Sequence, residues 1–220
     1  MFHSLVAGRL VDSLATLFLI STFASVVARQ MMGCVYAYAT QSLLLTAVAL
    51  TLAVVTGAPH LYLLAGLAFF VKALFIPWLL KRTIHDSVHE KRELSFYFGM
   101  PASLITSGIL VVVAWAATSN LPNLGAAALA ALNAGVGTIL IGLWTMISRR
   151  EAVPQVVGLL CAENGLMMAA LATVADLPLI TEIGILLDLV AGVLIMGILV
   201  RHMVAVGRTT DTAKFQRLRG

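Results

Sequence analysis

The chain contains 220 residues, of which 60% are hydrophobic and only 11% are charged. This composition excludes a soluble globular domain, because a folded chain of this size could not bury so much apolar surface. The apolar runs last about 20 residues, as a membrane helix requires, rather than the roughly 10 residues of a barrel strand. The net charge of +4 comes from Lys and Arg between these runs, so it does not indicate nucleic-acid binding. We predict an all-α, multi-pass membrane protein.

Seven membrane spans are predicted, each within the range of about 17–25 residues that crossing requires. They are expected at residues 5–28, 33–56, 60–80, 94–118, 124–147, 152–175 and 178–200. The linker TSNLPNLG divides a four-helix half (1–120) from a three-helix half (121–205), and a basic tail (206–220) follows. The first run lacks the basic start and the cleavage site of a signal peptide, so a retained helix is expected.

Basic residues follow the odd-numbered spans, as Arg29, KRTIHDSVHEKRE, SRRE and the tail. The linkers after spans two and four are uncharged, and the linker after span six carries only acids. Because basic loops stay in the cytoplasm, the N-terminus is expected outside and the C-terminus inside the cell. We predict a protein of the inner, cytoplasmic membrane. Only Arg9 and Lys72 depart from the pattern.

Polar residues mark the first two spans. Arg9 and Asp12 lie one helical turn apart, so an ion pair can neutralise both at the membrane interface; a part in proton exit is the alternative. The second span has a polar flank that includes Gln41. Such a flank predicts a hydrogen-bonded contact between helices, or else a water-lined path.

The third span carries Lys72 deep in an apolar run, about 13 Å along the helix from Lys81, so simple snorkelling to the interface would be strained. Pro77 cannot donate a main-chain hydrogen bond to Ala73 and is expected to bend or loosen the helix there. A buried Lys beside such a distortion is a candidate proton relay. A snorkelled side chain or a static counter-ion is the alternative.

The fifth span is rich in small residues, which let helix backbones approach closely within a membrane. They are Asn133, Gly135, Gly137 and Gly142. Tight packing against a neighbouring helix is therefore expected.

No cofactor, metal or catalytic site is predicted. His85 and His89 have a spacing that could bind zinc on a helix, but no further ligands are fixed, so a solvated or protein-docking loop is preferred. Cys34 and Cys161 lack metal-ligand spacing and are expected to be reduced. The chain has no C-x-x-C, no haem-type His pair within a span and no phosphate-binding glycine loop.

Two acids are expected at the same depth in the membrane. Glu163 follows Arg150 by thirteen residues, and Asp188 precedes Arg201 by thirteen, so each lies roughly 20 Å from the basic end of its helix. The short connection ADLPLITE makes these helices antiparallel neighbours. Burial and a second nearby acid favour a shared proton that an approaching cation can release. We therefore prefer a proton relay of Lys72, Glu163 and Asp188 to a static polar cluster.

The last three predicted helices resemble the K subunit of NADH:quinone oxidoreductase, respiratory complex I. They share a double-Arg turn, a Val-Gly-Leu step before a mid-membrane Glu, and a buried acid in the last helix, here at Arg149-Arg150, Val157-Gly158-Leu159, Glu163 and Asp188. Over its whole length the chain is similar to the hydrogenase-4 component E family. Four stretches carry this resemblance: Tyr38-Ala-Thr-Gln41-Ser-Leu, Lys72 to Pro77, Glu163-Asn164-Gly165 and Glu182-Ile-Gly184 leading to Asp188.

These resemblances imply a non-catalytic, proton-translocating subunit of a complex-I-like membrane-bound hydrogenase of the formate hydrogenlyase type. Its implied partners are antiporter-like subunits, a quinone-site-type membrane subunit, and a hydrophilic arm with nickel–iron and iron–sulfur centres. Glu163 corresponds to a membrane Glu implicated in proton transfer in the K subunit, and Asp188 replaces a second one. Auxiliary polar candidates are Glu182, Asp12, Arg9 and Gln41. The alternatives are a structural anchor of the same complex and a C-like subunit of a multi-subunit Na⁺/H⁺ antiporter.

Overall fold

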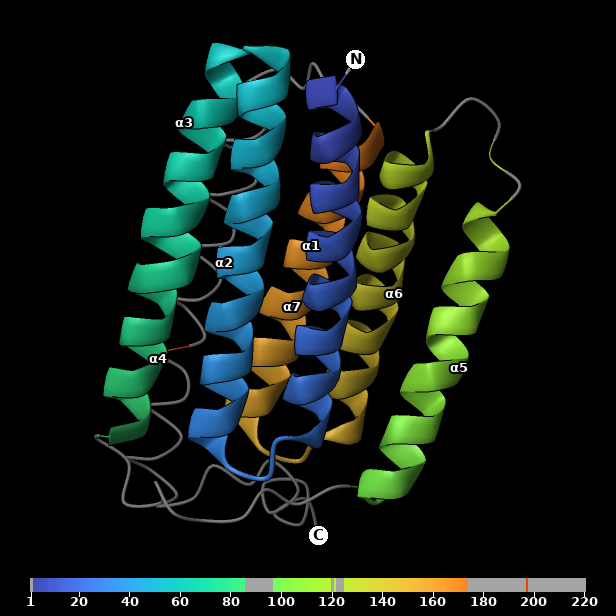
Figure 1. The fold of residues 1–220 in the computed structure, drawn as a ribbon. Helices are drawn as coiled ribbons and strands as arrows, with labels where there is room; N and C mark the ends of the chain where they lie inside the picture. The colour runs from blue at the N-terminus through green and yellow to red at the C-terminus, as the bar shows by residue number, and fades with distance from the viewer. Residues whose placement is uncertain (1, 86–96, 120, 122–124, 174–196, 198–220) are drawn as a thin grey trace, which may run out of the picture.

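A computed structural model of the protein describes residues 2–85, 97–119, 121, 125–173 and 197 (Figure 1). The longer helices are α1 (Phe2–Val27), α2 (Met31–Thr56), α5 (Met100–Thr118), α6 (Ala126–Ser148) and α7 (Ala152–Thr173). Between α2 and α5, the segments α3 (Pro59–Leu67), η1 (Ala68–Phe75) and α4 (Ile76–His85) follow one another as a single rod. Residues 2–173, where described, contain no strand, which confirms the all-helical prediction for this part of the chain.

Six of the predicted spans have counterparts among helices long and apolar enough to cross a membrane. These are Val6–Val27, Met31–Thr56, Leu61–Arg82, Met100–Thr118, Ala126–Ser148 and Val153–Thr173. Apart from residue 197, the predicted span 178–200, with Glu182 and Asp188, and the basic tail lie outside the described residues. The orientation of the bundle in the membrane stays a prediction.

Helix α5 begins at Met100, whereas the sequence predicted a span from residue 94. Residues 97–99 are described and are not helical. Gly99 has a φ of +76°, which an α-helix cannot contain, and Pro101 fits the first turn because its missing N–H needs no partner there. Gly and Pro together therefore set the start of α5.

The helices run up and down, so the same ends meet repeatedly (Figure 1). The α1–α2 and α6–α7 connections lie at the end of the bundle where α4 finishes and α5 starts. We call this the basic end, because its described residues include Arg29, Lys81, Arg82, Arg149 and Arg150. The basic residues of these connections thus gather at one end of the described bundle, as the sequence predicted.

Glycines bring α6 and α7 into backbone contact. A Cβ added at Gly165 would lie 2.6 Å from the Gly135 carbonyl oxygen, and one at Gly158 would lie 2.8 Å from the Gly142 carbonyl oxygen. Glycine is therefore required at both crossings, which confirms the close packing predicted for the fifth span. The two crossings lie on either side of Glu163 along α7, so they fix the position of that side chain relative to α6.

Arg149 connects the α6–α7 turn to the end of α1. Its side chain is only 1% exposed, and Nη2 donates to the main-chain oxygens of Ser25, Val26 and Ala28 at 3.3, 2.6 and 3.0 Å. A cation at a helix C-terminus both satisfies the last carbonyl groups and interacts favourably with the helix dipole. Arg149 therefore holds three helices together at the basic end.

We expect Arg149→Gln to destabilise the protein by about 2–3 kcal/mol, because charge-assisted hydrogen bonds to buried carbonyl groups are lost. Arg150→Gln is the matched control, since Arg150 is half-buried and lies over the Tyr97 ring at 4.6 Å. The melting temperature of the purified protein measures both changes. Equal losses in the two variants would contradict a special role for Arg149.

Two apolar clusters fill the bundle, one toward each end. The basic-end cluster joins α2, α4 and α7 through Met31, Cys34, Val35, Tyr38, Ile76, Leu80, Ile84, Val153, Val156, Val157, Leu160 and Cys161. The opposite-end cluster joins α1, α2, α3, α6 and α7 through Val11, Ala15, Phe18, Leu45, Val48, Ala49, Ala53, Leu61, Leu64, Ala65, Ala131, Ala134, Met168 and Leu171. Between the two clusters, along α2, α7 and the rod from Pro59 to His85, lie polar side chains.

Candidate functional site

Lys72 lies midway along the rod from Pro59 to His85, in the π-helical segment η1. The main-chain N–H of Ile76 bonds to the Val71 carbonyl five residues back, which widens the helix around Lys72. Pro77, next in the chain, has no N–H to continue the ladder. The predicted loosening beside Pro77 therefore takes the form of a π-helix, a feature often found at functional sites.

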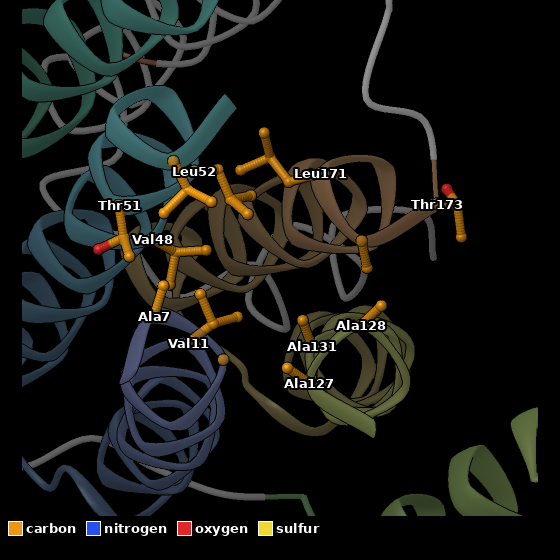
Figure 2. A pocket seen from close by; sticks show the side chains of 13 residues that line it. Ala7, Val11, Val48, Thr51, Leu52, Ala127, Ala128, Ala131, Leu171 and Thr173 are labelled. Atoms are coloured by element: carbon orange, nitrogen blue, oxygen red, sulfur yellow. The ribbon is translucent and has the colours of Figure 1, made fainter. Parts of the chain in front are cut away.

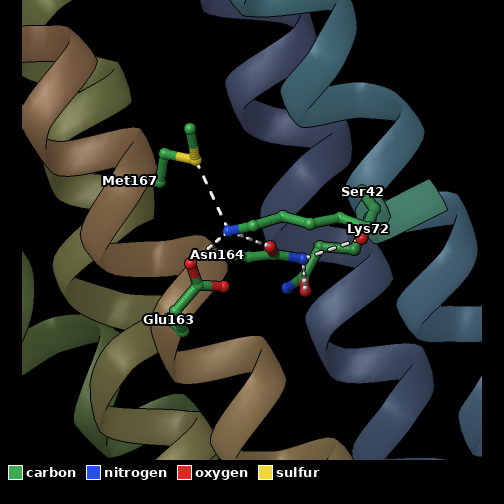
Figure 3. A network of polar contacts seen from close by, with 6 residues as sticks. Ser42, Lys72, Glu163, Asn164 and Met167 are labelled. Carbon is green, nitrogen blue, oxygen red and sulfur yellow. Dashed lines mark hydrogen bonds and ion pairs between the residues drawn. The ribbon is translucent and has the colours of Figure 1, made fainter. Parts of the chain in front are cut away.

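The Lys72 ammonium forms an ion pair with Glu163 of α7 (Figure 3). Its Nζ also donates to Asn164 Oδ1 at 3.3 Å and lies 3.4 Å from Met167 Sδ. The Lys72 side chain is 0% exposed and the Glu163 side chain 10% exposed. Two opposite charges thus meet near the middle of two predicted membrane spans.

A chain of hydrogen bonds leads sideways from this pair through three further helices. Asn164 Nδ2 donates to Gln41 Oε1 at 3.1 Å and to Ser42 Oγ at 3.0 Å, both on α2. Gln41 Nε2 then donates to Thr22 Oγ1 of α1 at 2.7 Å. Thr22 and Thr138 of α6 share a hydrogen bond of 3.0 Å between their hydroxyls. We call these residues the polar layer: Thr22, Gln41, Ser42, Lys72, Thr138, Glu163 and Asn164.

The side-chain amides of Asn164 and Gln41 are aligned: each has its oxygen on the side of Lys72 and its NH₂ group on the far side. The Asn164 oxygen faces the Lys72 ammonium, and its NH₂ group faces the Gln41 oxygen. This alignment favours a positive charge at Lys72, and neighbouring hydrogen bonds polarise one another when they share a direction. The second carboxylate oxygen of Glu163, Oε2, is buried and has no hydrogen-bond partner among the residues that the structure describes.

The structure places the predicted site residues in three groups. Lys72 and Glu163 meet, and Gln41 joins them through Asn164. Asp188 and Glu182 lie outside the described residues. The expected Arg9–Asp12 ion pair is wrong: both side chains are exposed, and the described part of α1 holds no ion pair between them. Exposed pairs gain little from contact, so nothing holds these two side chains together.

The sequence prediction missed Thr22, Ser42, Thr138 and Asn164 as site residues. The sequence gives little indication that these four residues belong to a site, because uncharged polar residues are common in packed membrane helices. Asn164 had the best signal, since it directly follows Glu163 in an otherwise apolar helix. Its two neighbours in the polar layer, Gln41 and Ser42, belong to the flank already noted in the second span.

A cavity of about 360 Å³ opens between α1, α2, α6 and α7, away from the polar layer (Figure 2). Its lining is mostly Ala, Val and Leu. The hydroxyls of Thr51 and Thr173 in that lining donate to carbonyl groups of their own helices, Ala47 at 2.7 Å and Ala169 at 2.9 Å. The cavity thus offers no free hydroxyl proton, and it is not a candidate for proton transfer.

No group of three or more His, Cys, Asp or Glu residues within the described ranges could hold a metal ion. His89, half of the predicted zinc alternative, lies outside those ranges. Cys34 and Cys161 are buried with free thiols in the basic-end cluster.

Three curated proteins illustrate what the chain is similar to. Hydrogenase-4 component E of Escherichia coli K12 is 30% identical over 214 residues, which cover 96% of this chain and 98% of that protein. Hydrogenase-4 component E of Shigella flexneri gives the same values. Uncharacterized protein Rv0085 of Mycobacterium tuberculosis is 31% identical over 150 residues, 68% of each chain. No protein-family model and no solved structure matches the chain.

Proposed function

Because the chain belongs to the hydrogenase-4 component E family, we propose that it is the proton-translocating membrane subunit of a complex-I-like hydrogenase of the formate hydrogenlyase type. In this proposal, redox chemistry in partner subunits drives ion movement through this one. The Lys72–Glu163 pair, buried between two apolar clusters, is the observation that carries the proposal.

A buried ion pair is costly to build, which favours a functional explanation. Taking two charges out of water costs several kcal/mol each, and apolar residues of similar volume would often be at least as stable. An ionisable side chain inside a membrane is, by default, a candidate for ion transfer. Here both charges lie at mid-span and are connected to a hydrogen-bonded layer.

The geometry offers a way to switch the proton affinity of Glu163. Lys72 has a second acceptor in Asn164 Oδ1 at 3.3 Å, so its ammonium can leave Glu163 without losing every hydrogen bond. With the ammonium away, burial favours the protonated carboxyl group, and its return favours release of the proton. The widened η1 segment supplies Lys72 with a backbone that is not locked in an α-helical ladder. In this proposal Asp188 serves as the next acid along the path.

The proposed surroundings follow from the family. The subunit lies in the inner membrane with its basic end in the cytoplasm, beside antiporter-like subunits and a quinone-site-type subunit. The hydrophilic arm with nickel–iron and iron–sulfur centres carries the redox reaction. This chain is not itself the catalyst in our proposal.

The test is Glu163→Gln in the intact complex, reconstituted in vesicles, with proton flux measured per assembled complex during turnover. We expect flux to fall by at least about tenfold, because Gln cannot take up and release a proton. Gln keeps an oxygen for the Lys72 ammonium, so assembly should survive. Asp12→Asn is the matched control, an acid-to-amide change at an exposed position, and should leave flux unchanged.

Wild-type flux in both Glu163→Gln and Asp188→Asn would overturn the proposal. The chain would then be a structural anchor of the complex. In that case, removal of residues 206–220 would disrupt assembly while the acids could be replaced freely.

A further inference from the structure

Tyr38 of α2 presents a buried hydroxyl that the relay described above does not use. The side chain is 0% exposed, and its hydroxyl makes no hydrogen bond of acceptable geometry with any residue that the structure describes. An unpaired buried hydroxyl costs free energy, and phenylalanine would fill the same space without that cost. A tyrosine at this position therefore calls for a functional explanation.

Along α2, Tyr38 lies between the basic end and Gln41 of the polar layer. Tyr38 precedes Gln41 and Ser42 by about one helical turn, so the three side chains share one face of α2. Ser42 on this face accepts a hydrogen bond from Asn164, the residue next to Glu163, so the Tyr38 face of α2 is directed toward the polar layer. The carboxylate oxygen Glu163 Oε2 is also buried without a partner among the described residues.

Within the basic-end cluster, Tyr38 is the member best able to carry a proton; the buried polar residues Ser25, Ser148 and Glu151 at the same end lie outside this apolar cluster. The basic-end cluster that contains Tyr38 is otherwise made of aliphatic side chains, Met31 and the two thiols of Cys34 and Cys161. Tyr38 is thus the sole hydroxyl-bearing member of this cluster as described. Any proton that passes from the basic end to Glu163 through this cluster meets one strong oxygen donor and acceptor.

We propose that the Tyr38 hydroxyl is the proton-transfer group that connects Glu163 with the basic end of the bundle. This inference rests on the proposed function, because it gives Glu163 its route of proton supply. Neither the Tyr38 hydroxyl oxygen nor Glu163 Oε2 has a hydrogen-bond partner among the described residues. In this inference they are the donor and the acceptor of one proton transfer, which takes place when the two side chains move into contact.

The step balances without any change in oxidation state. The Tyr38 O–H bond breaks as a new O–H bond forms on Glu163 Oε2. At the same time the phenol oxygen takes a replacement proton from a hydronium ion on the basic side, which becomes water. In total, one proton moves from the basic side to Glu163, and Tyr38 is neutral before and after the step.

The test compares Tyr38→Phe with Tyr36→Phe in the intact complex in proton-flux vesicles. Tyr36 is the matched control, because it lies on the same helix but is 59% exposed. We expect Tyr38→Phe to lower proton flux by at least about tenfold, because phenylalanine has no hydroxyl proton to transfer. The melting temperature should stay the same or rise, since the unpaired hydroxyl is gone. Tyr36→Phe should change neither quantity.

The outcomes separate this inference from the proposed function. Loss of flux in Glu163→Gln with normal flux in Tyr38→Phe overturns the role of Tyr38 alone. Normal flux in both variants overturns both. If Tyr38→Phe fails to assemble, trifluorotyrosine at position 38 keeps the ring and hydroxyl while making the phenol more acidic. A shifted pH profile of flux then supports the inference, and an unchanged profile overturns it.

Discussion

Lys72→Met is expected to destabilise the protein by about 3–5 kcal/mol, the typical result of removing one partner from a buried ion pair. Glu163 then stays in the polar layer without its cation, and its carboxylate has no other ion-pair partner in the described part of the chain. Asn164 loses its donor as well. The measurement is the melting temperature of the purified complex, with its yield as a second readout.

The control for Lys72→Met is the double variant Lys72→Met/Glu163→Gln. It removes both charges, so it should recover most of the lost stability while proton flux stays absent. Recovery of stability without recovery of flux would separate the energetic role of the pair from its functional role. A double variant no more stable than Lys72→Met would contradict a direct interaction between the two side chains.

Gly142→Ala is expected to cost about 3 kcal/mol, at the upper end for overpacking, and to reduce assembly sharply. The added Cβ would lie 2.6 Å from the Gly158 carbonyl oxygen and 2.7 Å from the Ala162 nitrogen. Both are main-chain atoms, so α7 as a whole must shift. Because α7 carries Glu163 and Asn164, the shift also reaches the contacts of Lys72.

Gly108→Ala is the matched control in another membrane helix. A Cβ at Gly108 meets nothing within 4 Å, and alanine is a better helix former by about 0.5–1 kcal/mol. Stability should therefore stay the same or rise, as measured by melting temperature in detergent. Similar losses in both variants would show that glycine matters for helix flexibility rather than for close approach of α6 and α7.

The charged centre of the site could be predicted from the sequence, whereas its geometry could not. Lys72 and Glu163 each interrupt a long apolar run, and a charge in such a place has few explanations. They are 91 residues apart in the chain, so only the packing of the rod against α7 shows that they touch. The sequence placed both side chains inside apolar runs, but rotation of each helix about its axis decided that they meet.

Other features had no readable signal. The segment Ala68–Phe75 has the composition of an ordinary apolar helix, and Pro77 indicated a disturbance without its form. Thr22 looks like any threonine in a membrane helix, because its role comes from Gln41 on the neighbouring helix. The Arg9–Asp12 pair was predicted from spacing alone. Spacing brings two side chains within reach, but contact at an exposed position also needs a gain in free energy.

The two apolar clusters on either side of the polar layer make the described bundle an electrical insulator. A proton on Glu163 faces hydrocarbon in both directions, where the energy of an unpaired charge is far higher than in water. In the proposed function, this arrangement keeps the membrane potential from discharging through the subunit when its partners are idle. Proton transfer through Glu163 would then require one cluster to loosen while the other stays closed, and the timing of that exchange would set how tightly redox work and ion movement are coupled.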